Sequence, residues 1–100
     1  MSEDWSDDEL RLCVQRYWKA VMNKGTEREI ERKAFIKGIM KESVSLRTRG
    51  EGSISQRMCN ISAVMEANGR PWVIGWKPLR NVGTGVTPRI EALLRDHKLI

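Results

Sequence analysis

Three short motifs of the form Ser/Thr-x-x-Glu/Gln stand at the start of helical patterns in this chain, and they constrain its fold more than any other feature. They begin at Ser6, Thr26 and Ser53. In such a capping box, the hydroxyl group and the acid or amide three residues later satisfy free backbone N–H groups at a helix start. The motifs therefore predict a mainly α-helical chain with at least three helices.

The first predicted helix follows Ser6, whose capping partner is Glu9, and it ends at Gly25. Trp5 and Leu10 are placed to form a hydrophobic staple around the cap. Apolar side chains then recur at helical spacing, at Leu10, Val14, Tyr17, Trp18 and Val21. The helix dipole explains the acidic residues of the first turn, so we do not interpret them as a metal site.

The second helix is predicted from about Glu27 to Ser43, and the third from about Ile54 to Ala67, with a polar loop at residues 45–52 between them. One face of the third helix is apolar and is expected to lie in the core: Ile54, Met58, Ile61 and Met65. The opposite face is expected to be exposed, with Arg57 beside it: Gln56, Asn60, Ala63 and Ala67.

A short strand and a last helix complete the predicted fold. Trp72, Ile74 and Trp76 alternate with smaller residues, which is the period of a strand. Thr87 and Pro88 are typical of an N-cap and first helical position. The sequence therefore predicts one domain, residues 1–100, with three or four helices and one short extended segment. The order of these elements resembles helix-turn-helix and winged-helix proteins.

The charge distribution favours a polyanionic partner. The chain carries a formal net charge of +5, but five of its 13 acids lie in the first ten residues. The remaining ninety residues therefore hold 18 basic and 8 acidic side chains. A surface with such an excess attracts nucleic acid at long range.

Catalytic and metal chemistry find little support in the sequence. Cys13 and Cys59 belong to no zinc motif and are interpreted as small buried side chains in a reducing compartment. His97 is the single histidine, and no nucleophile elbow or phosphate-binding loop is present. We therefore predict a protein that is not an enzyme and uses no cofactor. The acidic N-terminus does not resemble a signal peptide and no apolar run would span a membrane, so we expect a cytoplasmic protein.

Double-stranded DNA is the predicted partner, and the third helix is predicted to enter its major groove. Amide and guanidinium groups on the outer face would read base edges: Gln56, Arg57 and Asn60, with Ser55 near the helix start. Four basic residues outside this helix would contact phosphates: Arg47, Arg49, Lys77 and Arg80. Asn60 has an alternative role, because its amide could instead bond backbone groups of a neighbouring loop.

A second interpretation assigns the chain to protein interaction. The predicted strand from Trp72 to Trp76 has no partner strand in this sequence. It could pair with its copy in a homodimer or with another protein. A salt-dependent affinity for DNA would favour the first interpretation, and a stable dimer without DNA affinity would favour the second.

Several of these residues also resemble a known module, over roughly residues 5–83. The matching segments are Asn60-Ile61-Ser62-Ala63-Val64-Met65, Pro71-Trp72-Val73 and Gly75-Trp76-Lys77-Pro78, with Gly69 and Asn81. They resemble a small N-terminal module of bacterial HNH endonucleases and restriction-type proteins. The resemblance implies target recognition for an attached nuclease, with modified DNA among the candidate targets. This chain has no HNH motif, and Gly50 stands where the pattern usually has serine, so nuclease chemistry would belong to another polypeptide.

Overall fold

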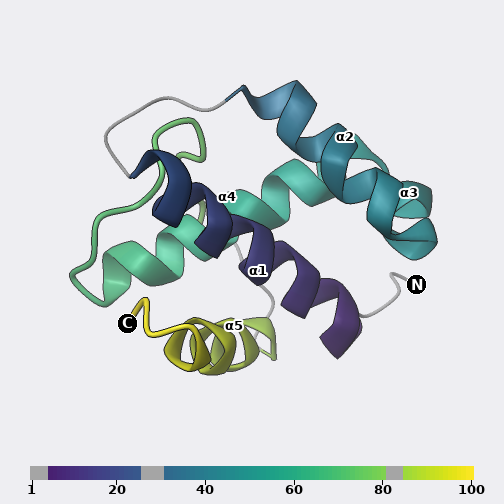
Figure 1. Ribbon diagram of the computed structural model, residues 1–100. Helices are drawn as coiled ribbons and strands as arrows, with labels where there is room; N and C mark the ends of the chain where they lie inside the picture. Colours follow the sequence, from purple (N-terminus) through teal and green to yellow (C-terminus); the bar gives the residue numbers. More distant parts are fainter. Residues whose placement is uncertain (1–4, 26–30, 81–84) are drawn as a thin grey trace.

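The computed structural model describes residues 5–25, 31–80 and 85–100, and this part of the chain is mainly helical (Figure 1). It contains five helices, which are α1 (Asp7–Lys24), α2 (Arg32–Glu42), α3 (Val44–Arg49), α4 (Glu51–Ala67) and α5 (Val86–Asp96). No strand occurs among the described residues. The mainly α fold class is therefore confirmed.

Helix α4 is the centre of the structure. Helices α1, α2, α3 and α5 all contact it, and α1 crosses it in Figure 1. The expected core residues Ile54, Met58, Ile61 and Met65 are all buried, which confirms the inner face. Residues 60–65, however, are buried around the whole circumference of the helix. Only the first turns of α4 and its last residues therefore reach solvent.

Helix α1 begins as its sequence predicts. Ser6 Oγ accepts a hydrogen bond from Glu9 N at 3.1 Å, and Ser6 N donates to Glu9 Oε1 at 2.9 Å. Trp5 and Leu10 on either side of this cap are both buried. The helix ends at Gly25, whose φ of 73° suits glycine and whose N–H bonds to Val21 O. The first capping box is thus confirmed, whereas the Thr26 box lies outside the described residues.

The predicted loop at residues 45–52 is wrong, because α3 occupies most of it. Ser43 caps this short helix by accepting a hydrogen bond from Leu46 N at 3.2 Å, and the Leu46 side chain is fully buried. Helix α4 then starts at Glu51, after Gly50 with φ 90°. Ser53 consequently lies inside the first turn of α4 and is not its cap.

Two further helix starts differ from the prediction. Glu31 has an extended backbone with ψ 94°, so α2 starts at Arg32, while the predicted start at Glu27 lies outside the described residues. Helix α5 begins at Val86, which places Thr87 and Pro88 inside its first turn. Proline is tolerated there because the first N–H groups of a helix have no intrahelical acceptor.

The predicted strand at Trp72–Trp76 is also wrong, because the chain turns within it. Trp76 N donates to Val73 O at 3.1 Å, and Gly75 permits the turn with φ 108°. Val73 and Trp76 are consequently buried together, while Ile74 is 40% exposed. An i, i+3 pair replaces the expected i, i+2 alternation.

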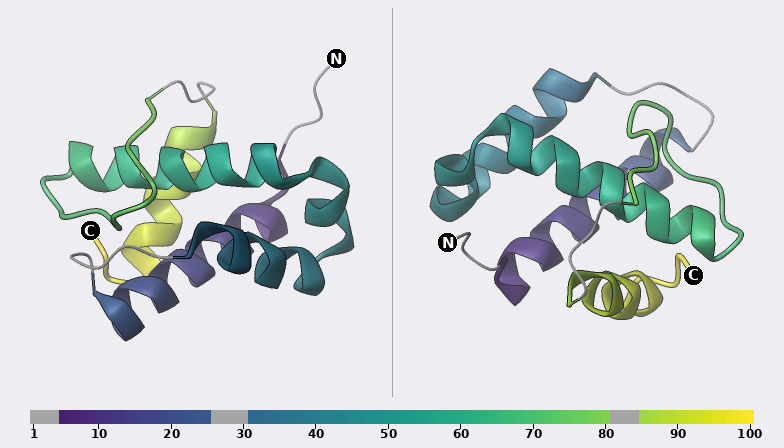
Figure 2. Two further views of the ribbon diagram at one scale, coloured as in Figure 1. Left: turned by 90° about the horizontal axis from the view of Figure 1, so that it is seen from above. Right: turned by 180° about the vertical axis from the view of Figure 1, so that it is seen from behind.

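The segment at residues 70–80 runs back along α4 after that helix ends, as Figure 2 shows in green. Tyr17 in α1 fixes it, because its hydroxyl accepts a hydrogen bond from Val73 N at 2.9 Å and bonds Ser62 Oγ at 2.8 Å. Leu79 N donates to Cys59 O at 3.1 Å. These bonds attach the segment to the side of α4 that was expected to be open.

Candidate nucleic-acid interface

The four residues predicted to read bases do not share one exposed face. Gln56 is exposed, Ser55 and Arg57 are partly buried, and Asn60 is 1% exposed. The difference arises because residues 70–80 cover α4 beyond its second turn. The accessible part of the predicted reading face is therefore the beginning of α4, where Gln56 is exposed and Ser55 and Arg57 are partly exposed.

Asn60 is a structural residue, so its predicted role as a base reader is wrong. Its Nδ2 donates to Leu79 O at 2.6 Å, and its Oδ1 accepts from Arg57 Nη1 at 3.1 Å. A side chain held in this way cannot reach a base edge while residues 76–80 remain in place. The structure supports the alternative interpretation, in which the amide bonds loop backbone.

We expect Asn60→Ala to lower the free energy of unfolding by about 1–3 kcal/mol, because Leu79 O and Arg57 lose a buried partner. Urea titration followed by circular dichroism measures this change. Gln56→Ala is the matched control on the same helix and should change stability by less than about 0.5 kcal/mol. Equal midpoints for the two variants would contradict the structural role.

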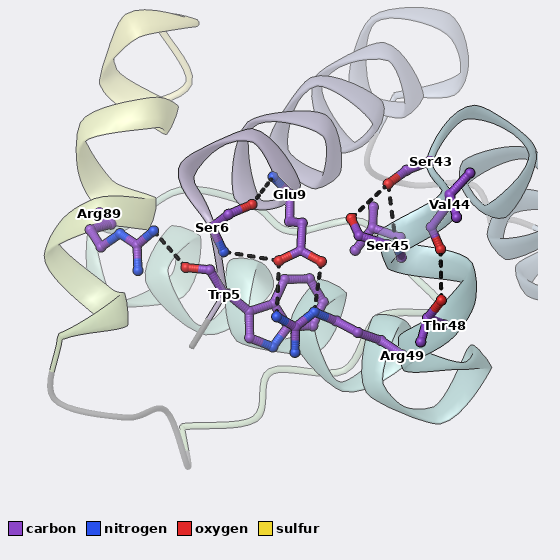
Figure 3. Close-up of polar contacts among 10 residues, drawn as sticks. Trp5, Ser6, Glu9, Ser43, Val44, Ser45, Thr48, Arg49 and Arg89 are labelled. Carbon is purple, nitrogen blue, oxygen red and sulfur yellow. Dashed lines mark hydrogen bonds and ion pairs between the residues drawn. The ribbon is translucent and has the colours of Figure 1, made fainter. Parts of the chain in front are cut away.

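Arg49 was predicted to contact phosphates, but in the structure it pairs with an acid of α1 and is not available to DNA. Its Nε lies 2.7 Å from Glu9 Oε2 and its Nη2 lies 2.9 Å from Glu9 Oε1, as Figure 3 shows. The guanidinium also lies 4.5 Å from the centre of the Trp5 ring. The bonds from Arg49 lower the pKa of Glu9 to about 2, against the opposing effect of burial. This pair joins α1 to the α3–α4 corner.

The other predicted phosphate contacts differ in availability. Arg80 forms an exposed ion pair with Glu66 at 2.7 Å, which reduces its net charge toward DNA. Lys77 is exposed on the segment that covers α4. Arg47 is exposed on α3, and its Nε donates to Met40 O at 3.1 Å. This bond holds Arg47 at the C-terminal end of α2, where the helix dipole favours a positive charge.

A row of lysines on α2 is a basic feature that our sequence interpretation missed. Lys33, Lys37 and Lys41 are all exposed and follow one another at i, i+4 spacing along one side of the helix. Arg47 adds a fourth cation at the end of the row, beside residue 40. The i, i+4 spacing of these lysines is evident in the sequence, but our interpretation of this helix used only its apolar residues, such as Ile36 and Ile39, which face the core. We call Lys33, Lys37, Lys41 and Arg47 the α2 basic row.

The α2 basic row is not neutralised by the ion pairs of the structure. Every ion pair among the described residues uses an arginine: Arg11, Arg16, Arg49, Arg80 or Arg89. Lys33 lines a shallow cavity of about 200 Å³ together with Ser55, Arg32, Ile36 and Glu51. The start of α4 is therefore adjacent to the first lysine of the row.

In the described part of the chain, no cluster of histidine, cysteine, aspartate or glutamate side chains could hold a metal ion. None of the helices described is both long enough and apolar enough to cross a membrane. Comparison with protein-family models, with curated proteins and with solved structures found no match for this chain. The resemblance to a nuclease-associated module therefore remains a prediction.

Proposed function

We propose that this chain is a non-catalytic module that binds double-stranded DNA through the α2 basic row. The observation that carries the proposal is the line of three exposed lysines on one side of α2, which no carboxylate among the described residues neutralises. Basic side chains that contact phosphates provide most of the affinity of a protein for DNA.

The geometry of the row suits a phosphate backbone. Lys33 and Lys41 are eight residues apart on a helix, which corresponds to about 12 Å along its axis. Arg47 extends the row beyond the end of α2 and offers a planar group that can bond one phosphate at two points. The row would therefore fix the position and orientation of the module on DNA without reading its sequence.

Base reading is assigned to the beginning of α4. Ser55 lies beside Lys33, and Gln56 is exposed in the next position. A glutamine amide can bond adenine at two atoms in the major groove. In the proposed helix-turn-helix-like role, only the first turns of α4 act as the recognition element, because the remainder is covered.

The nuclease association belongs to the same proposal. A module that binds DNA without cutting it would direct a nuclease carried by a partner polypeptide to its target. This cytoplasmic, restriction-type role rests on the resemblance of the sequence. The alternative, a homodimer or protein interaction through residues 72–76, has less support, because a turn replaces the strand that it requires and Trp76 is fully buried.

The test is a triple variant, Lys33→Gln, Lys37→Gln and Lys41→Gln, assayed for binding to a duplex at several salt concentrations. We expect weaker binding to every duplex and a slope of log K against log salt that decreases by up to about 2.7, since each lost phosphate contact removes about 0.9.

A second triple variant provides the matched control for charge. Lys19→Gln, Arg70→Gln and Arg95→Gln remove the same number of exposed cations from α1, α5 and the segment after α4. This variant should retain most of the slope. If both triple variants lose affinity equally, net charge and not the α2 basic row explains the binding, and the proposed surface is wrong.

A further inference from the structure

Three arginines lie near Trp5, and within residues 5–25, 31–80 and 85–100 two of them pair with an acid. Arg49 pairs with Glu9 as described above. Arg89 in α5 pairs with Asp7, its Nη2 lying 2.7 Å from Asp7 Oδ1, and also donates to Trp5 O at 2.7 Å. Figure 3 shows Arg89 and Arg49 on either side of the Trp5 backbone and ring. The third arginine, Arg57, lies 4.7 Å from the centre of the Trp5 ring.

Arg57 has no acidic partner among the described residues. Its only hydrogen bond there is the one from Nη1 to Asn60 Oδ1, a neutral acceptor. Its Nε is buried and bonds to nothing. Glu9 and Asp7, the described carboxylates in the ion pairs of this cluster, bind Arg49 and Arg89. Among the described residues, one positive charge is therefore in excess around Trp5.

This excess charge stands in an unfavourable environment. Partial burial lowers the pKa of Arg57, and Arg49 and Arg89 repel its charge and lower it further. Buried polar groups are normally satisfied, and a partly buried cation normally has an anion beside it. A hydrogen bond to Asn60 Oδ1 requires only a neutral donor. This bond alone therefore does not explain why a charged guanidinium stands at position 57.

We propose that Arg57, with Trp5 beneath it and Arg49 and Arg89 beside it, binds a phosphate group. The guanidinium is planar, and its two terminal nitrogens can present parallel N–H groups that match two oxygens of a phosphate. Arg57 is only partly buried, so a ligand can reach it from solvent. The ion pairs of the two neighbouring arginines and the bond to Asn60 hold the site in shape before the ligand arrives. The site is distinct from the α2 basic row and does not depend on it.

The phosphate could belong to a nucleic acid or to a small molecule, and the chemistry of recognition is the same. Nucleic acid itself offers two kinds of group, a backbone phosphodiester that links two sugars and carries one negative charge, and a terminal phosphate monoester. A terminal or free phosphate carries more negative charge and exposes more oxygens, so both should bind Arg57 more tightly than a backbone phosphate does.

The direct test is a titration of the wild-type protein with inorganic phosphate, followed through the indole N–H signals in ¹⁵N-correlated NMR spectra. Chloride keeps the ionic strength constant. We expect the Trp5 signal to shift and saturate, while the Trp18 signal, from the α1 residue that contacts His97, stays in place. No saturating shift at Trp5, or an equal shift with chloride alone, would overturn the proposal.

Variants then assign the shift to Arg57. Arg57→Gln should weaken phosphate binding at least about tenfold, because it removes the charge-assisted bonds. Arg57→Lys keeps the charge but loses the planar pair of donors, and should bind with intermediate strength. Arg11→Gln, at an exposed arginine paired with Asp8, is the matched control and should bind as wild type does. If Arg57→Gln binds phosphate as tightly as the wild type does, Arg57 is not the binding site, even though the Trp5 signal of the wild type shifts.

Competition identifies the source of the phosphate. A short duplex with a 5′-terminal phosphate and the same duplex without it are each added to the phosphate-saturated protein. Displacement by the first alone supports a nucleic-acid terminus, and displacement by neither supports a free phosphate compound. Equal displacement by both would overturn the expected preference for a terminal or free phosphate. Repeating the experiment in the triple lysine variant separates this site from the α2 basic row.

Discussion

Replacement of Trp76 by alanine is expected to lower the free energy of unfolding by about 3–5 kcal/mol. Trp76 is the largest of the fully buried side chains, and its ring packs against that of Phe35 with centroids 5.8 Å apart and ring planes at 61°. Alanine would leave a cavity and remove the anchor of residues 70–80. Small domains are stable by only about 5–15 kcal/mol, so this variant should melt far below the wild type.

Two further variants, Trp76→Phe and Trp72→Ala, test whether the loss of stability is specific to the buried ring at position 76. Trp76→Phe keeps an aromatic ring and removes an indole N–H that bonds nothing among the described residues, so it should destabilise less than alanine does. Trp72→Ala removes a side chain of the same kind that is only partly buried, and should also have a smaller effect. Denaturant unfolding followed by circular dichroism measures all three. Equal losses for Trp72→Ala and Trp76→Ala would indicate the two-residue alternation of a strand and contradict the turn at Gly75.

The helices were predictable where their signals are local. The Ser6–Glu9 box is complete within four residues, and the inner stripe of α4 follows directly from helical spacing. The strand prediction failed for a local reason too, because Gly75 allowed a turn that periodicity does not detect. Helix α3 was missed because its single buried residue, Leu46, stands alone in a polar segment. A helix with only one buried position has no period to recognise.

The covered side of α4 was not predictable, because distant residues cover it. Asn60 and Ala63 follow the pattern of an exposed face, yet both are buried, and Asn60 is bonded to a segment that Tyr17 holds in place. Tyr17 and Val73 are 56 positions apart in the sequence, and no spacing rule connects them. A central helix can thus carry small and polar residues on a side that touches protein and not solvent.

The excess of positive charge was predictable from the sequence, but the position of the basic surface was not. The excess of lysine and arginine is evident from composition, but pairing decides which charges remain available. Arg49 pairs with Glu9, 40 residues away in the sequence, and Arg80 pairs with Glu66, 14 residues away, so neither ion pair was predictable from spacing. The lysines of α2 form a local pattern, and their i, i+4 spacing was the one readable signal of the surface that we now propose.

Glu9→Gln should destabilise the protein by about 3 kcal/mol at pH 7, since one pKa unit corresponds to about 1.36 kcal/mol and the pKa of Glu9 is lowered from 4.5 to about 2. Glu9 is 6% exposed, and its partner Arg49 would be left beside a neutral amide. Glutamine is accepted in capping boxes, so the bond with Ser6 N can persist. The variant therefore removes the charge of Glu9 while it preserves the start of α1.

The dependence on pH distinguishes this ion pair from a packing effect. The folded-state pKa of Glu9 lies below its unfolded value, so the carboxylate stabilises the fold fully above about pH 4.5 and progressively less toward pH 2. The difference in unfolding free energy between wild type and Glu9→Gln should therefore shrink over that interval. Titration of the other carboxylates cancels in this difference. Asp8→Asn, at an exposed acid in the same turn, should show little difference at any pH. A loss in Glu9→Gln that stays constant down to pH 2 would mean that shape and not charge holds α1 to the α3–α4 corner.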